Sequence, residues 1–118
     1  MFEKGSIIQR SVDGIEGFFG ALHMGIYVGK GYVIHFAGES SGSKGSGKVE
    51  KVTLKEFASN KKVILREAPH SKEHALAVLS RAYNYLRSGK FNGKYSIKSC
   101  NCQDFVYECF EGREHCKK

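Results

Sequence analysis

Two segments far apart in the chain carry residue types that together can perform nucleophilic catalysis. The first segment holds two histidines, His23 and His35, and the second holds Asn101 followed by Cys102. A cysteine attacks carbonyl carbons as its thiolate, and an imidazole beside it can take up the thiol proton. These residue types predict acyl transfer with Cys102 as the nucleophile, His23 as the general base and His35 as the residue that orients the base.

The two histidines must be positioned by a hairpin, for which the sequence predicts strands 23–28 and 32–37 joined by a loop at 29–31. Gly31 suits the left-handed conformation that such a loop requires. The resulting register pairs apolar residues across the strands: Met24 with Phe36, Ile26 with Ile34, and Val28 with Tyr32. Because side chains alternate between the faces of a strand, both histidines and Tyr27 fall on the other face. Gly25, opposite His35, leaves room there for another element.

Cys102 must be positioned by a helix, which the sequence predicts from residue 102 to about residue 110. Asn101 is a suitable N-cap, and Gly112 is a suitable end of the helix. The N–H groups of the first turn lack partners, and the helix dipole favours negative charge there. We therefore expect the Cys102 thiol to be shifted toward thiolate, and the same N–H groups to hold an oxyanion.

The remaining elements predict one domain over residues 1–118. Alternating or apolar runs predict strands at 5–10, 48–52 and 63–67. A Thr53-x-x-Glu56 capping box predicts a short helix to about residue 60, and an apolar stripe predicts a long helix over 72–88. Residues 38–47 form a low-complexity loop that could cover a site. The expected fold is α+β, with an antiparallel sheet of four to five strands packed against about three helices.

All four cysteines, at positions 100, 102, 109 and 116, lie in the last fifth of the chain. Such clustering, with no apolar signal-peptide segment, favours reduced thiols and a cytoplasmic location. We expect Cys109 and Cys116 to be core residues. Zinc is the alternative structural role, but the spacing contains no C-x2-C pair, so no metal and no cofactor are expected.

Basic residues outnumber acidic ones in the whole chain, with 19 Lys and Arg against 12 Asp and Glu and a net charge of +7. Many of them lie between Lys44 and Arg66. Such a segment is most often a solvated face, but it also suits nucleic acid or an anionic membrane. No nucleic-acid-binding motif is present, so no specific nucleic acid is expected, and a membrane surface is the partner class that suits this basic face. No apolar run approaches the roughly 18 residues that span a bilayer, so contact with a membrane would be peripheral.

The two chemistry-bearing segments together resemble the lecithin:retinol acyltransferase family, which includes the small phospholipase A/acyltransferases. Members share an H-box of the form H-x-G/A-I-Y-V-G-x-G-Y-V-I-H, which matches residues 23–35, and an N-C-x-x-F-V box, which matches residues 101–106. The opening Lys4-Gly5-Ser6-Ile7-Ile8 is also similar to the family. The sequence departs from the pattern at Met24, Gln103 and Asp104.

The resemblance implies a permuted papain-like fold of the NlpC type and a Cys–His–His triad made of Cys102, His23 and His35. It also implies a covalent thioester intermediate and phospholipid acyl esters as substrates. Tyr27, Gly25 and Asn101 are expected to shape or bind at the site. The alternative is an inactive H-box/NC interaction protein, viral or host, that keeps the fold. A thiol peptidase on the same fold is a third hypothesis.

Overall fold

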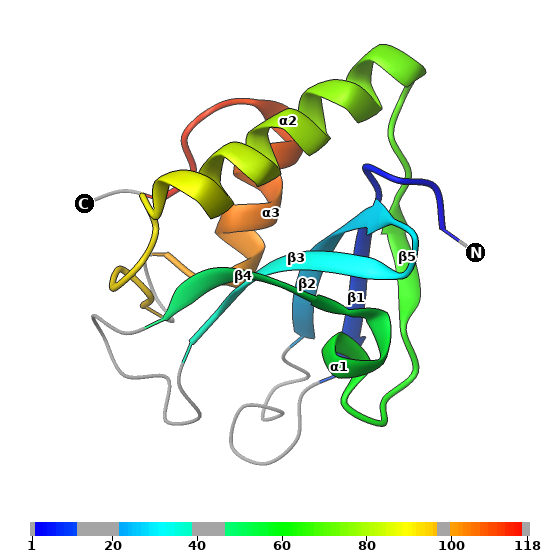
Figure 1. Cartoon of the computed structure of the whole chain (residues 1–118), viewed down its shortest axis with the longest axis horizontal. Helices are drawn as coiled ribbons and strands as arrows, with labels where there is room; N and C mark the ends of the chain where they lie inside the picture. The colour runs from blue at the N-terminus through cyan, green and yellow to red at the C-terminus, as the bar shows by residue number, and fades with distance from the viewer. Residues whose placement is uncertain (1, 12–21, 39–46, 97–99, 117–118) are drawn as a thin grey trace.

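In the part of the chain that the structure describes, a five-stranded antiparallel sheet packs with three helices (Figure 1). The structure, a computed structural model, describes residues 2–11, 22–38, 47–96 and 100–116. The predicted loop at 38–47 lies almost wholly outside the described residues. The strand order is β4-β3-β2-β1-β5. The elements in chain order are β1 (Ile7–Ser11), β2 (Leu22–Gly29), β3 (Tyr32–Ala37), β4 (Lys48–Thr53), α1 (Leu54–Ala58), β5 (Ile64–Glu67), α2 (Lys72–Ser88) and α3 (Cys102–Glu111).

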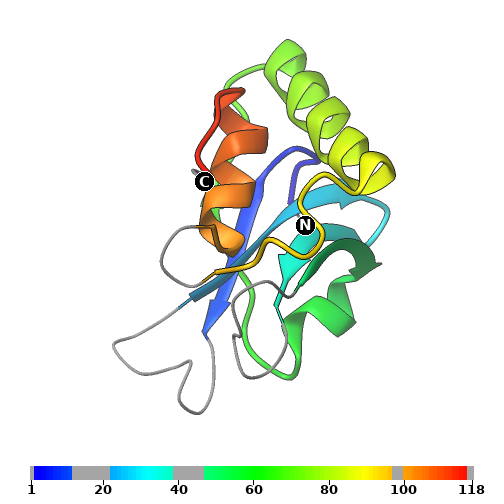
Figure 2. The same cartoon turned by 90° about the vertical axis from the view of Figure 1, so that its left-hand side faces the viewer.

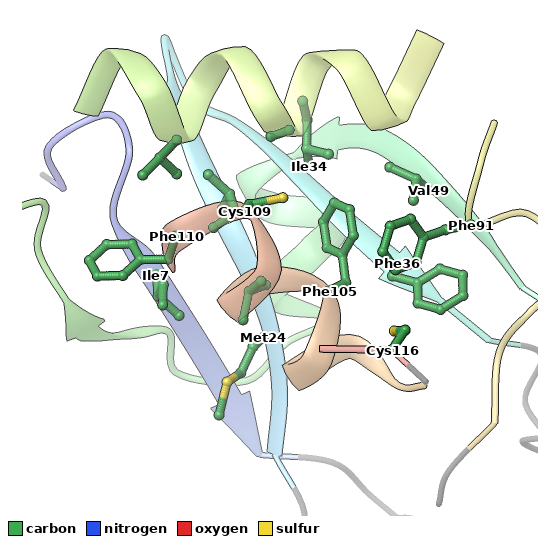
Figure 3. Packing of buried hydrophobic residues seen from close by; sticks show 14 of the residues in the cluster. Ile7, Met24, Ile34, Phe36, Val49, Phe91, Phe105, Cys109, Phe110 and Cys116 are labelled. Atoms are coloured by element: carbon green, nitrogen blue, oxygen red, sulfur yellow. The ribbon is translucent and has the colours of Figure 1, made fainter. Parts of the chain in front are cut away.

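The helices cover opposite faces of the sheet, with α2 and α3 on one side and α1 on the other (Figures 1 and 2). The main core lies under α2 and α3, where the rings of Phe36, Phe91 and Phe105 pack edge to face (Figure 3). A smaller core lies under α1, where Phe57 contacts Ile8, Tyr27 and Val33. The sheet is therefore buried on both faces at β2 and β3, the strands that carry the histidines.

The hairpin of β2 and β3 confirms the predicted separation of the two faces. Ile26 pairs with Ile34, and both lie in the main core, as do Met24 and Phe36. The prediction that Val28 faces Tyr32 is wrong, because Gly29 pairs with Tyr32. Gly29, Lys30 and Gly31 all have positive φ, so the chain makes a tight turn and places a bulge before it. The bulge accommodates one extra residue in β2, so the predicted pairing of Ile26 with Ile34 is kept.

Local capping signals define the ends of the helices. Thr53 and Glu56 form the predicted capping box of α1, and Ser71 accepts a hydrogen bond from the His74 N–H at the start of α2. Asn101 accepts hydrogen bonds from the N–H groups of Gln103 and Asp104, and Gly112 ends α3 in the left-handed conformation. No helix within the described residues is long and apolar enough to cross a bilayer.

The expectation that all four cysteines are reduced is wrong, because Cys100 and Cys116 form a disulfide. The chain reverses after Gly112, which brings Cys116 back to the start of α3, where Cys100 precedes Asn101. Glu108 supports this return by accepting hydrogen bonds from the His115 and Cys116 N–H groups. Cys109 is a buried free cysteine in the main core, as predicted. The disulfide therefore encloses the helix that carries Cys102.

Reduction of the disulfide is expected to lower the free energy of unfolding by about 3 kcal/mol, because the bond closes a short loop in the unfolded chain. The loop joins residues 16 apart. Urea unfolding with and without a reductant measures the change. The same reductant should have no effect on Cys100→Ser, and an equal effect on both proteins would contradict the assignment.

Candidate functional site

The two histidines of the hairpin contact each other directly on the face of the sheet covered by α1. His23 Nε2 lies 2.7 Å from His35 Nδ1, a hydrogen-bond distance. The sequence predicted that both side chains share a face, and the structure adds that their ring nitrogens lie at hydrogen-bond distance. Because His23 Nε2 is engaged in this contact with His35, His23 Nδ1 is the ring nitrogen that is left to accept a proton from another group.

Phe57 of α1 covers this histidine pair. Its ring stacks on His23 at a centroid distance of 5.3 Å and meets His35 edge-on at 5.7 Å. Gly25 makes this approach possible, as predicted. A Cβ atom at Gly25 would lie 2.6 Å from Val33 Cγ1 and 2.9 Å from Phe57 Cε1, closer than real contacts allow. The absent side chain therefore lets α1 pack closely against the pair.

Two charged residues flank the histidines from the neighbouring strands, and sequence reasoning missed both. Glu50 of β4 pairs with His35 across the strands, and its carboxylate Oε2 lies 3.5 Å from His35 Nε2. Arg10 of β1 pairs with His23, and its Nε donates to the Phe57 carbonyl oxygen. We name the resulting series Arg10, His23, His35 and Glu50 the polar row. These two charged residues could have been predicted only by assigning the pairing of β1 and β4 with the strands of the hairpin.

Burial keeps the imidazole of His23 neutral. It lowers the pKa of His23 to about 3, and repulsion from His35, when that ring is protonated, and from Arg10 acts in the same direction. Burial also lowers the pKa of His35, and Glu50 opposes this shift because its carboxylate favours the charged ring. Both histidines are therefore unprotonated bases at neutral pH. A neutral imidazole is the form that a general base requires.

The stability of the fold is expected to decrease as the pH falls from 6.5 toward 3. In this interval an unfolded His23 binds a proton and the folded one does not, so protons favour the unfolded state. Urea unfolding at a series of pH values measures the slope. His23→Gln should show a shallower slope, and an unchanged slope would contradict a neutral His23 in the folded protein.

Cys102 begins α3 and lies against the start of β2. Its Sγ is 3.7 Å from the Leu22 carbonyl oxygen, and the Met24 N–H also interacts with the sulfur. The thiol therefore contacts the backbone on both sides of His23. Among the described residues, no hydrogen bond joins Cys102 Sγ to a His23 ring nitrogen. Backbone groups of Leu22, Met24 and the first turn of α3, rather than the imidazole, are the polar contacts of the thiol.

Electrostatics at Cys102 differ from the sequence expectation. Burial raises the pKa of the thiol above its usual value, although the N–H groups of Met24, Cys102 and Gln103 and the charge of Arg10 act in the opposite direction. The N–H groups at the helix start thus lower the pKa of the thiol as predicted. Burial raises this pKa by more, because Cys102 is only 5% exposed. Cys102 rests as a neutral thiol, and its ionisation requires a base.

The other expected site residues lie at structural positions around this centre. The Tyr27 hydroxyl accepts a hydrogen bond from the Gly31 N–H, and its ring packs against Phe2, so that Tyr27 braces the hairpin turn. Asn101 caps α3, and its own N–H donates to Asp104. Asn101 therefore orients the turn that carries the thiol, and Tyr27 holds the hairpin that carries the histidines.

Comparison with known protein families identifies a match. The model of the family described as lecithin retinol acyltransferase matches residues 2–115, nearly the whole chain. A comparison with curated proteins finds no match. The matched region includes the hairpin, the polar row and the start of α3, so every element of the site lies within it.

Proposed function

Because the chain belongs to the lecithin retinol acyltransferase family, we propose that it is a thiol-dependent phospholipid acyltransferase and phospholipase A. Membership of this family supports an enzyme of the acyltransferase or phospholipase kind. One observation carries the finer proposal: a neutral His23, held by His35 at 2.7 Å, lies in the strand whose backbone contacts the Cys102 thiol. A buried thiol and a partly buried neutral imidazole on neighbouring elements are the starting state of a Cys–His pair.

In the proposed first half-reaction, His23 Nδ1 takes the proton from Cys102 Sγ, and the thiolate attacks the carbonyl carbon of an acyl ester. The negative charge moves to the carbonyl oxygen, for which the N–H groups of Cys102 and Met24 near the sulfur are the candidate donors. The tetrahedral intermediate then collapses. The ester C–O bond breaks, the leaving oxygen takes the proton from His23, and a thioester remains on Cys102.

In the second half-reaction, water or another acceptor attacks the thioester carbonyl, and His23 takes the acceptor's proton. The C–S bond breaks, and the Cys102 thiolate recovers that proton. Water gives a free fatty acid, which is phospholipase A activity, whereas an amine, a lysolipid or retinol gives acyl transfer. Phe57 stacks on one face of His23 and so limits the approach of water from that face, which favours acceptors that bind beside the site.

The substrate is proposed to be reached at a membrane surface by peripheral binding, on the cytoplasmic side. Exposed lysines on β4 and α1 support this part of the proposal, since a positive surface attracts anionic lipid headgroups. They include Lys48, Lys51, Lys55 and, just after α1, Lys62. A nucleic-acid partner is not proposed, because the sequence contains no motif for one.

The experiment that tests the proposed function is product analysis with phospholipid vesicles that contain an anionic lipid. The proposal predicts a lysophospholipid and a free fatty acid in water, and an N-acyl product when a primary amine is added. Cleavage of peptides with no lipid product would instead indicate a thiol peptidase. If neither substrate is converted, the result contradicts a catalytic role and favours the non-catalytic interaction protein.

A further inference from the structure

Glu50 has no role in the half-reactions above, yet it is the acidic residue that faces the histidine pair. His35 is buried, and its Nε2 makes no hydrogen bond that meets normal geometry among the described residues. That nitrogen lies 3.5 Å from the Glu50 carboxylate, which is part-exposed on β4. Arg10 of β1 is paired with His23, and its positive charge acts on both rings. The uncharged Phe57 of α1 packs against both rings. Cys102 of α3 contacts the backbone of Leu22 and Met24, on either side of His23.

The position of one proton decides whether His23 can act as a base. A neutral imidazole carries hydrogen on one nitrogen only, and the His23–His35 hydrogen bond can be donated from either ring. If His35 Nδ1 donates, His23 Nε2 must accept and its Nδ1 carries the hydrogen, so His23 cannot take a proton from Cys102. If His23 Nε2 donates, its Nδ1 has a free lone pair.

We propose that Glu50 is a positioning residue that selects the second of these arrangements, an inference that rests on the proposed role of His23 as base. A carboxylate accepts hydrogen bonds and repels a lone pair, so it favours hydrogen on the facing His35 Nε2. His35 Nδ1 is then an acceptor, His23 Nε2 must donate to it, and His23 Nδ1 is left unprotonated. Along the polar row, the Glu50 carboxylate thus attracts the hydrogen on His35 Nε2, and His35 Nδ1 accepts a hydrogen bond from His23 Nε2.

The same carboxylate also stabilises the reaction after the proton has moved. When His23 becomes imidazolium, its positive charge is shared with His35 through their hydrogen bond, and Glu50 lies at the far end of that connection. Arg10 lies at the opposite end of the polar row, where its charge disfavours the imidazolium. Glu50 therefore both selects the tautomer and offsets the positive charge that builds up.

The inference is tested by long-range ¹H–¹⁵N correlation spectra of the imidazoles in the ¹⁵N-labelled full chain at neutral pH. Both His23 and His35 should be protonated at Nε2 in the wild type. Glu50→Leu removes the acceptor and should move hydrogen toward His35 Nδ1 and His23 Nδ1. Glu50→Gln retains an acceptor oxygen and should keep the wild-type tautomers. The matched control is Glu67→Gln, which removes a carboxylate 3.4 Å from the exposed His70 and should leave both rings unchanged.

Kinetics give the second measurement. Thioester formation should slow roughly 10- to 100-fold in Glu50→Leu, as for other groups that orient a reacting residue. The inference would be overturned if His35 Nδ1 carries the hydrogen in the wild type, or if Glu50→Leu keeps the wild-type tautomers. The first of these measurements uses only the wild-type protein, so it remains decisive even if Glu50→Leu folds poorly. If the spectra show the predicted tautomers but the protein transfers no acyl group, the proposed function is overturned and the tautomer assignment is retained.

Discussion

Replacement of Cys102 by serine is expected to abolish phospholipid conversion, with a loss on the order of 10⁶-fold, as when the nucleophile of another nucleophile–base pair is removed. The thiol is the group at the start of α3 that can form the covalent intermediate, and a serine hydroxyl is far less readily ionised in a buried site. Release of lysophospholipid from vesicles measures the effect.

The matched control for this variant is Cys109→Ala. Cys109 is a free, fully buried thiol on the same helix and lies in the main core. Its replacement should lower stability by creating a small cavity while the folded protein retains turnover. Equal losses of activity in the two variants, with both still folded by circular dichroism, would show that the loss is not specific to the Cys102 thiol and would contradict its assignment as the nucleophile.

Replacement of His23 by glutamine is expected to slow acyl transfer by roughly 10²- to 10⁴-fold, the usual contribution of a general base. Glutamine can keep a hydrogen bond to His35, so the hairpin should remain intact, but its amide cannot accept a proton. Because the pKa of His23 is lowered to about 3, wild-type activity should not decline through protonation of this ring as the pH falls from 8 toward 5. Initial rates over this pH range measure both effects.

The control for the His23 variant is His70→Gln, which alters an exposed histidine at the start of α2, away from the polar row. This variant should have wild-type rates. A His23→Gln protein with more than about a tenth of wild-type activity would contradict the role of His23 as base, because a lost general base costs at least about 10²-fold. In that case the thiol would have to lose its proton to a group other than His23, with only the backbone N–H groups around Cys102 to stabilise the thiolate.

Local patterns made much of the site predictable. Alternation of apolar residues in the hairpin placed both histidines on one face, because side-chain direction has a period of two in a strand. The capping preferences of Asn101 and Gly112 located the helix that carries Cys102, since these residues satisfy specific backbone groups. Each of these predictions depends on residues close together in the chain.

Features that depend on tertiary contacts could not be predicted in the same way. Glu50 and Arg10 come next to the histidines through the pairing of β4 and β1, which no short pattern encodes. Phe57 looks like an ordinary apolar residue of a short helix until α1 folds over Gly25. The helix-start argument gave the wrong direction for the Cys102 pKa, because the degree of burial decides that balance and is a property of the whole fold.

The disulfide shows a similar limit. Spacing and the lack of a signal segment favoured reduced thiols, but they contain no information on where the chain goes after α3. The reversal at Gly112 and the contacts of Glu108 bring Cys116 to Cys100. Cysteine composition alone is therefore a weak guide when two cysteines lie on either side of one helix.

The central claim, that Cys102 carries the acyl group, is tested most directly by intact-mass spectrometry after incubation with phospholipid vesicles. The proposed mechanism predicts added mass equal to one fatty acyl group, located on Cys102 by peptide mapping and removed by hydroxylamine, as expected for a thioester. The His23→Gln protein should acquire it far more slowly. An unmodified Cys102 that remains accessible to alkylation, in protein exposed to several lipid preparations, would contradict the claim.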